Sequence, residues 1–165
     1  MNESAKMAKI KRVELIFHTP GVFLVETEIA ADKIRAYRAT DYRLGHTDQD
    51  IVLAVGLRSN RLAALFAAKG VTCGAFLTAY NPRGTQKSDA DNDQAHKQLA
   101  TQLATHGLET IEGSGSEEGT DWPSEKSYFA FGLDRDSSIA IGKLFDQDAI
   151  VWVGESAVPE LVLLR

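Results

Sequence analysis

The hydrophobic pattern of the chain alternates short apolar segments with polar turns and helical stretches. Residues 51–57 form a continuous apolar run with three β-branched residues, which predicts a buried strand. In the next stretch, 61–69, apolar residues recur at the spacing of one helix face. Ser59 or Asn60 is suited to cap this helix at its start, and Gly70 is suited to stop it at its end. Strands and helices are therefore expected to share one core.

The rest of the chain is organised around residues 71–106. This stretch combines a buried strand at 71–80, a polar turn, and a long helix at 88–106. Ser88 or Asp89 is expected to cap the helix, and its acidic first turn favours the positive end of the helix dipole. We predict that this helix is the longest in the chain.

Two stretches require a choice between interpretations. Residues 34–44 alternate weakly like a strand but also fit a helical face, and we favour a helical turn at 31–37 followed by an extended segment at 40–44. Residues 113–121 are rich in Gly and Ser, so we expect them to form the most mobile internal loop. The remaining patterns predict strands at 13–17, 22–29, 108–112, 127–133, 149–153 and 160–164, and a helix at 134–146 with Ile139, Ile141, Leu144 and Phe145 buried.

Together these elements predict an α+β fold with about six or seven strands and about three helices. The short connections between the last strands imply antiparallel pairs, whereas the strand–helix–strand segments allow parallel crossovers. We expect a single mixed, largely antiparallel sheet with the helices packed mainly on one face. Residues 1–30 are expected to form an N-terminal extension folded as a β-hairpin, and residues 31–165 a single α+β domain.

Composition adds limits on the class of protein. The chain has 165 residues, of which 44% are hydrophobic and 25% charged, as expected for one ordinary globular domain. No apolar run approaches the ~18 residues of a membrane helix, and the N-terminus lacks the apolar core of a secretion signal. The single cysteine, Cys73, rules out an internal disulfide framework. We therefore expect a cytoplasmic protein without a membrane segment.

The charge distribution argues against nucleic acid as a partner. The net charge is −5, with +2 over residues 1–61 and −7 over residues 62–165. Nucleic-acid binding depends on counterion release by Lys and Arg, which an acidic chain supplies poorly. The expected partner is an unidentified small molecule or another protein.

Several familiar chemistries are missing from the sequence. It contains neither the glycine pattern of a phosphate-binding loop nor that of a nucleophile elbow. The four histidines share no ligand spacing with one another or with Cys73, which argues against a structural zinc site. Asp89, Asp91 and Asp93 have the spacing of a calcium loop but lack its glycine and its final glutamate. We therefore predict neither a metal nor a cofactor.

A distributed set of polar and aromatic residues forms the candidate site. Asn81 follows the strand at 71–80, and Glu125 precedes the strand at 127–133. If these two strands pair antiparallel, both side chains face a common cavity with an aromatic ring in its wall. Glu125 is the candidate general base and Tyr42 the candidate acid or hydrogen-bond donor, which makes these two the candidate catalytic residues. The candidate ligand-binding residues are Tyr37, Thr40, Tyr80, Asn81, Asn92, Trp122, Ser127 and Gln147.

The same residues also allow purely structural roles. Asn-Pro is a common turn opener, so the Asn81 side chain could bond its own backbone. Trp122 could cover the core, and Gln147 could hold a backbone group at the end of a helix. The alternative function is then a regulatory or protein-interaction module without catalysis.

Five motifs together resemble a bacterial family called domain of unknown function 3293. They are YRATDY (37–42), FLTAYNP (76–82), DNDQAHKQL (91–99), WPSEKS (122–127) and LFDQDAIVWV (144–153), and they run in order over about residues 34–163. The resemblance implies no activity. It implies that the signature positions of the family are Tyr37, Thr40, Tyr42, Asn81, Pro82, Asn92, Trp122, Glu125 and Gln147. This chain has FDQDAIV where the family pattern is FGQNAIV, so Asp146 and Asp148 are departures from that pattern.

Overall fold

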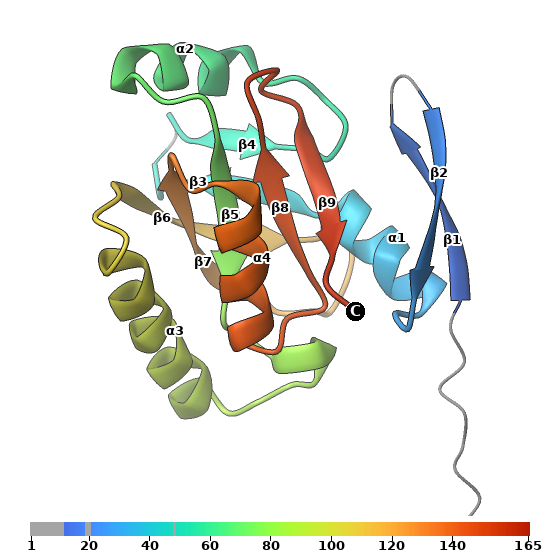
Figure 1. Cartoon of the computed structure of the whole chain (residues 1–165). Helices are drawn as coiled ribbons and strands as arrows, with labels where there is room; N and C mark the ends of the chain where they lie inside the picture. Colours follow the sequence, from blue (N-terminus) through green and yellow to red (C-terminus); the bar gives the residue numbers. More distant parts are fainter. Residues whose placement is uncertain (1–11, 19–20, 48) are drawn as a thin grey trace, which may run out of the picture.

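The computed structural model describes residues 12–18, 21–47 and 49–165, with side chains described from residue 26 onward (Figure 1). Its strands are β1 (Arg12–His18), β2 (Gly21–Thr27), β3 (Asp41–Leu44), β4 (Ile51–Leu53), β5 (Gly74–Thr78), β6 (Thr110–Ser116), β7 (Glu125–Phe131), β8 (Ala149–Val153) and β9 (Pro159–Leu163). Its helices are α1 (Ala31–Ala39), α2 (Asn60–Lys69), α3 (Asp89–Ala104) and α4 (Arg135–Leu144), with a short 3-10 helix, η1 (Pro82–Gly84).

Seven strands form one sheet in the order β4-β3-β6-β7-β5-β8-β9. This confirms the predicted α+β class, with four α-helices where about three were expected. Every pairing in this sheet is antiparallel, so the parallel crossovers that the sequence allowed do not occur. The helices α3 and α4 instead connect strands that are not neighbours in the sheet.

The helices cover both faces of the sheet, which differs from the expectation that they pack mainly on one face. Leu99 of α3 and Ile141 of α4 pack in one hydrophobic cluster, and Figure 1 shows α4 lying across β5 and β8. Ile34 of α1 and Phe66 of α2 belong to the cluster on the opposite face. Two covered faces explain why β5 is apolar at successive positions rather than at alternate ones.

The caps confirm the predicted start of α3 and the predicted start and end of α2. The side chain of Ser88 accepts a hydrogen bond from the Asp91 N–H and begins α3, which is the longest helix of the described chain. Ser59 caps α2 in the same way, and Gly70 ends it with a φ of 67°. The left-handed conformation at the end of α2 is one that glycine adopts at little cost.

Several boundaries and one burial prediction were wrong. The segment at 31–37 is the greater part of a complete helix, α1, and β4 and β5 are shorter than the apolar runs that predicted them. Leu144 is 63% exposed rather than buried. The buried residues of α4 are Ser138, Ile141 and Gly142. Leu144 lies outside the buried face of α4, whereas Phe145 is partly buried and packs against the core.

The Gly- and Ser-rich stretch is a strand over residues 113–116 and irregular over residues 117–121. β6 continues to Ser116 and pairs with β3 on one side and β7 on the other. At Gly113 a Cβ would collide with the backbone oxygen of Arg43. The glycine that suggested a flexible loop is therefore required by close packing between strands. The irregular segment shortens to residues 117–124.

Hydrogen exchange should separate these two segments. We expect slow amide exchange over residues 113–116, because both edges of β6 are paired, and fast exchange over residues 118–123. Mass spectrometry of peptides from the native protein would measure both. Equal protection of the two segments would contradict the strand assignment.

The first two strands form a separate two-stranded sheet. β1 and β2 pair antiparallel from Arg12↔Thr27 to His18↔Gly21, which is the hairpin pattern expected from the sequence. The side chain of Thr27 donates a hydrogen bond to the backbone oxygen of Arg165 (2.6 Å). Residues 1–11 lie outside the described part, and the division into an extension and a domain stays a prediction. Among the described residues, no helix is long and apolar enough to cross a membrane.

Candidate functional site

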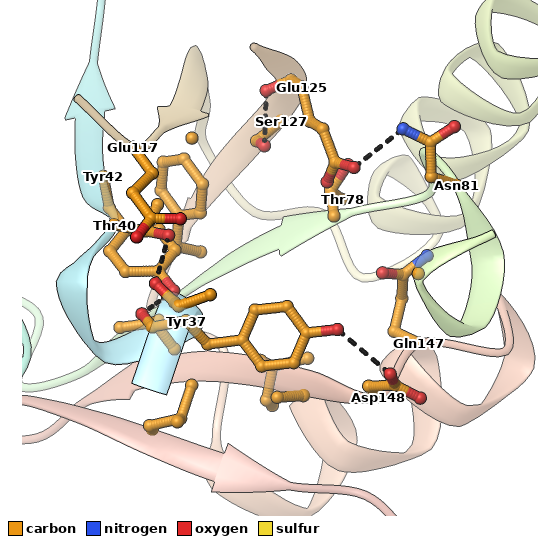
Figure 2. A pocket seen from close by; sticks show the side chains of 18 of the residues that line it. Tyr37, Thr40, Tyr42, Thr78, Asn81, Glu117, Glu125, Ser127, Gln147 and Asp148 are labelled. Atoms are coloured by element: carbon orange, nitrogen blue, oxygen red, sulfur yellow. Dashed lines mark hydrogen bonds between the residues drawn. The ribbon is translucent and has the colours of Figure 1, made fainter. Parts of the chain in front are cut away.

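A cavity of about 240 Å³ lies between α1 and the sheet. Its walls come from α1, from strands β3, β5, β6, β7 and β8, and from the segments that follow β5 and precede β7 (Figure 2). Eight of the ten candidate residues line it: Tyr37, Thr40, Tyr42, Asn81, Trp122, Glu125, Ser127 and Gln147. The two candidates outside the lining are Tyr80 and Asn92.

Antiparallel pairing of β5 and β7 brings Asn81 and Glu125 together, as predicted. Thr78 pairs with Ser127, so the chain after β5 lies beside the chain before β7. The Asn81 amide nitrogen donates a hydrogen bond to Glu125 Oε1 (2.8 Å), and Figure 2 shows the two side chains facing each other. Both residues line the cavity, and aromatic rings share its wall.

Asn81 is held by a second asparagine from the first turn of α3. Asn92 Nδ2 donates to Asn81 Oδ1 (3.0 Å), and Asn92 Oδ1 accepts from the backbone N–H of Asn81 (2.9 Å). The backbone N–H of Lys87 also donates to Asn81 Oδ1 (3.0 Å). Asn81 has a φ of 46°, a left-handed conformation that asparagine tolerates better than most residues. Asn92 therefore orients Asn81 from behind the cavity wall.

The Glu125 carboxyl group is the main acidic group at this end of the cavity. Trp122 Nε1 donates to the same oxygen, Oε1, as Asn81 does (3.1 Å). Burial raises the pKa of Glu125, and the hydrogen bonds from Asn81 and Trp122 offset part of that rise. Both of these donors bind Oε1, which leaves Oε2 as the oxygen available to a ligand.

Tyr37 and Tyr42 line the cavity, and their phenol groups stay protonated. The Tyr42 hydroxyl donates to the backbone oxygen of Tyr37 (2.6 Å), and the Tyr42 ring meets Phe76 edge-on at 5.2 Å. Burial raises the pKa of both phenols well above their ordinary range. The Tyr42 proton is thus already engaged, which favours a structural role over that of a catalytic acid.

A second polar group, Asp148, lies at the other end of the cavity. Its side chain is 1% exposed, and it accepts hydrogen bonds from the Tyr37 hydroxyl (3.0 Å) and from Arg165 Nε (2.6 Å). Lys33 Nζ lies 3.6 Å from the same carboxylate. Charged residues flank the apolar runs of β8 and β9 in the sequence, and the antiparallel pairing of these strands brings Asp148 close to Arg165. Asp146, the other departure from the family pattern, is exposed and pairs with Arg83.

A comparison of the chain with models of known protein families found a match. The model of a family described as "Protein of unknown function (DUF3293)" matches residues 77–150. Over residues 77–150, which we call the DUF3293 segment, the chain is similar to this family. No curated protein and no solved structure matches the chain.

The cavity is shared between the DUF3293 segment and the chain outside it. The DUF3293 segment supplies Asn81, Trp122, Glu125 and the Asp148 carboxylate, whereas α1 and β3 supply the tyrosine walls. The motif at 37–42 thus lies outside the matched residues but lines the same cavity. Among the residues that the structure describes, no group of three or more His, Cys, Asp or Glu side chains could hold a metal ion.

Tyr80 and Gln147 of the DUF3293 segment have other contacts. Tyr80 faces α3, where its hydroxyl donates to Asp93 Oδ1 (2.7 Å), a carboxylate that also pairs with Lys126 (2.8 Å). The chain leaves the sheet after Thr78, so strand alternation no longer sets the side of Tyr80. Gln147 lines the cavity, but its amide donates to the backbone oxygens of Tyr80 (3.1 Å) and Phe145 (3.3 Å). This matches the structural interpretation of Gln147.

His96 of the DUF3293 segment should make stability depend on pH. It stacks on Tyr128 at 4.3 Å, and its Nδ1 is buried without a hydrogen-bond partner. Burial lowers the pKa of His96, with Glu112 and Asp93 favouring its charge and Lys126 opposing it. Because the unfolded chain takes up the proton first, stability should fall as pH drops below ~6.5.

Urea unfolding from pH 7.5 to pH 5 would measure this loss. In His96→Phe the loss should be smaller, because the stacking remains but the titration is removed. His106, exposed just beyond α3, provides the control variant His106→Gln. An unchanged pH slope in His96→Phe would contradict the assignment.

Proposed function

We propose that the protein binds a small organic molecule in this cavity, with the Glu125 carboxyl group as its principal polar contact. The observation that carries the proposal is the Asn81–Glu125 pair, which holds a largely desolvated carboxyl group at the cavity wall. A buried carboxyl group with a raised pKa is costly to a fold and is typical of binding and catalytic sites.

The lining also supports a ligand site over an interaction module. Apolar and aromatic walls with a few placed polar groups are the usual composition of small-molecule pockets. Eight of the ten candidate residues, from distant parts of the chain, line this one cavity. At about 240 Å³ the cavity suits a compact ligand.

Binding is the core of the proposal, and catalysis is an extension of it. Glu125 is the residue suited to act as a general base on a bound ligand. Tyr42, the other catalytic candidate, already donates its proton to the backbone of Tyr37. Any turnover would therefore depend on Glu125 rather than on a pair of catalytic groups.

A ligand screen tests the proposal. Thermal shift with nucleotides, amino acids and sugars at high concentration should reveal a compound that raises the melting temperature. In a Trp152→Phe variant, Trp122 is the remaining tryptophan, so a ligand in the cavity should change its fluorescence. Stabilisation without a Trp122 signal would place the ligand elsewhere, and the absence of any hit would favour a regulatory or protein-interaction module.

The proposal extends to location. We propose a cytoplasmic bacterial protein, which the single cysteine and the family resemblance support.

A further inference from the structure

We infer that the ligand of this cavity is a compact organic cation, namely an amine, amidinium or ammonium group on an apolar body. This inference rests on the proposed function and specifies its ligand class. It depends on how the charged side chains of the lining are paired.

The basic side chains near the cavity, Lys33 and Arg165, both lie against Asp148 at one end of it. Arg165 Nε lies 2.6 Å from Asp148 Oδ1, and Lys33 Nζ lies 3.6 Å from Asp148 Oδ2. Lys33 Nζ also donates a hydrogen bond to the backbone oxygen of Arg83 (2.7 Å). The charge of Asp148 is therefore compensated within the protein, and Lys33 is held against that end.

The other two acidic residues of the lining lack such compensation. Glu117 and Glu125 both face the cavity, and Figure 2 shows Glu117 beside Thr40 and Tyr42. No ion pair among the described residues involves either carboxylate. Trp122 and Asn81 donate to Glu125 as neutral groups. The end of the cavity opposite Asp148 is therefore electronegative.

Aromatic rings surround these carboxylates. Tyr37, Tyr42, Phe76 and Trp122 all line the cavity. The faces of aromatic rings attract cations, and Trp and Tyr do so most strongly. Carboxylates combined with aromatic walls are the usual means of recognising an ammonium group, whereas an anion would meet uncompensated negative charge.

Electrostatic effects on the tyrosines agree with this geometry. After burial, which is the largest cause, nearby acidic groups further raise the pKa of both phenols. Asp148 and, to a smaller extent, Glu125 act on Tyr37, whereas Glu125 and Glu117 act on Tyr42. The negative potential thus extends across the tyrosine wall.

Matched pairs of probes test the inference. Isothermal titration of the whole chain at pH 7.5 would compare 2-phenylethylamine with 2-phenylethanol, benzamidine with benzamide, and choline with 3,3-dimethylbutan-1-ol. We expect at least one cation to bind at least 10-fold more tightly than its neutral partner, and its affinity to fall as NaCl is raised. Phenylacetate, an anion, should not bind.

Two neighbouring glutamates provide the variants. Glu117→Gln should weaken binding of that cation several-fold, whereas Glu118→Gln should leave it unchanged, because Glu118 is exposed and does not line the cavity. If every neutral probe binds as tightly as its cation, or if none of the cations binds, the inference is wrong. A neutral or anionic ligand that changes Trp122 fluorescence would overturn the inference while supporting the proposed function.

Discussion

Glu125→Gln should abolish ligand binding and leave the protein at least as stable as the wild type at pH 7. Glutamine keeps an oxygen that can accept the hydrogen bonds from Asn81 and Trp122, so the local geometry persists. The substitution replaces the negative charge and the second oxygen, Oε2, with a neutral amide group of nearly the same shape. Isothermal titration would show the loss of binding, and urea unfolding would measure the change in stability, which we expect to stay within about 1 kcal/mol.

The stability of the wild type should depend on pH, because the pKa of Glu125 differs between the folded and unfolded states. Burial raises the pKa of Glu125 in the folded protein, so the folded state holds the proton more tightly than the unfolded chain does. The resulting stability is present below the unfolded pKa of Glu and is lost as pH rises through the raised folded pKa. The wild type should therefore lose stability over that window, and Glu125→Gln should not. If Glu125→Gln instead unfolds the protein, Glu125 is a structural tie.

Asn81→Ala should cause the largest loss of stability among the site variants, about 3–5 kcal/mol. The substitution removes the acceptor of the Asn92 amide, a buried group that costs ~1–3 kcal/mol when left unpaired, and it also removes the acceptor of the Lys87 N–H and the donor to Glu125. Alanine also tolerates the left-handed backbone at this position poorly. Urea unfolding would measure the loss.

A double-mutant cycle would show whether the two asparagines act as a unit. Asn92→Ala alone should cost about 2–3 kcal/mol, and the double variant should cost less than the sum of the two single variants. Asn60→Ala, at the exposed start of α2, is the control and should change stability by less than about 0.5 kcal/mol. A cost for Asn81→Ala no larger than that of Asn60→Ala would rule out the network as a stabilising element.

The pairing of Asn81 with Glu125 could be predicted from the positions of the two residues next to their strands and from the assumption that β5 and β7 run antiparallel. Each residue lies just beyond a strand, and antiparallel neighbours place those two ends side by side. The helices were predictable for a similar reason, since their caps and apolar spacing are encoded within a few residues. These features require no knowledge of distant parts of the chain.

The features that the sequence did not reveal depend on distant partners. Gly113 has the composition of a loop, and only the approach of Arg43 from β3 makes it a strand residue. The burial of Asp148 likewise depends on distant residues, because its carboxylate accepts hydrogen bonds from Arg165 and Tyr37. Helix placement on both faces depends in the same way on how the whole sheet curves.

The strand order also has a consequence for how the protein is made. β5 pairs with β7 and β8, which both come later in the chain. At about 5–20 residues per second, roughly two to nine seconds pass between the synthesis of Thr78 and that of Glu125. During this interval β5, which is buried over residues 74–77 in the folded protein, has no strand partner, and α2 and then α3 are the helices available to cover its faces. On the ribosome, β5 is therefore an apolar strand that waits for its partners, which is the kind of segment that chaperones protect.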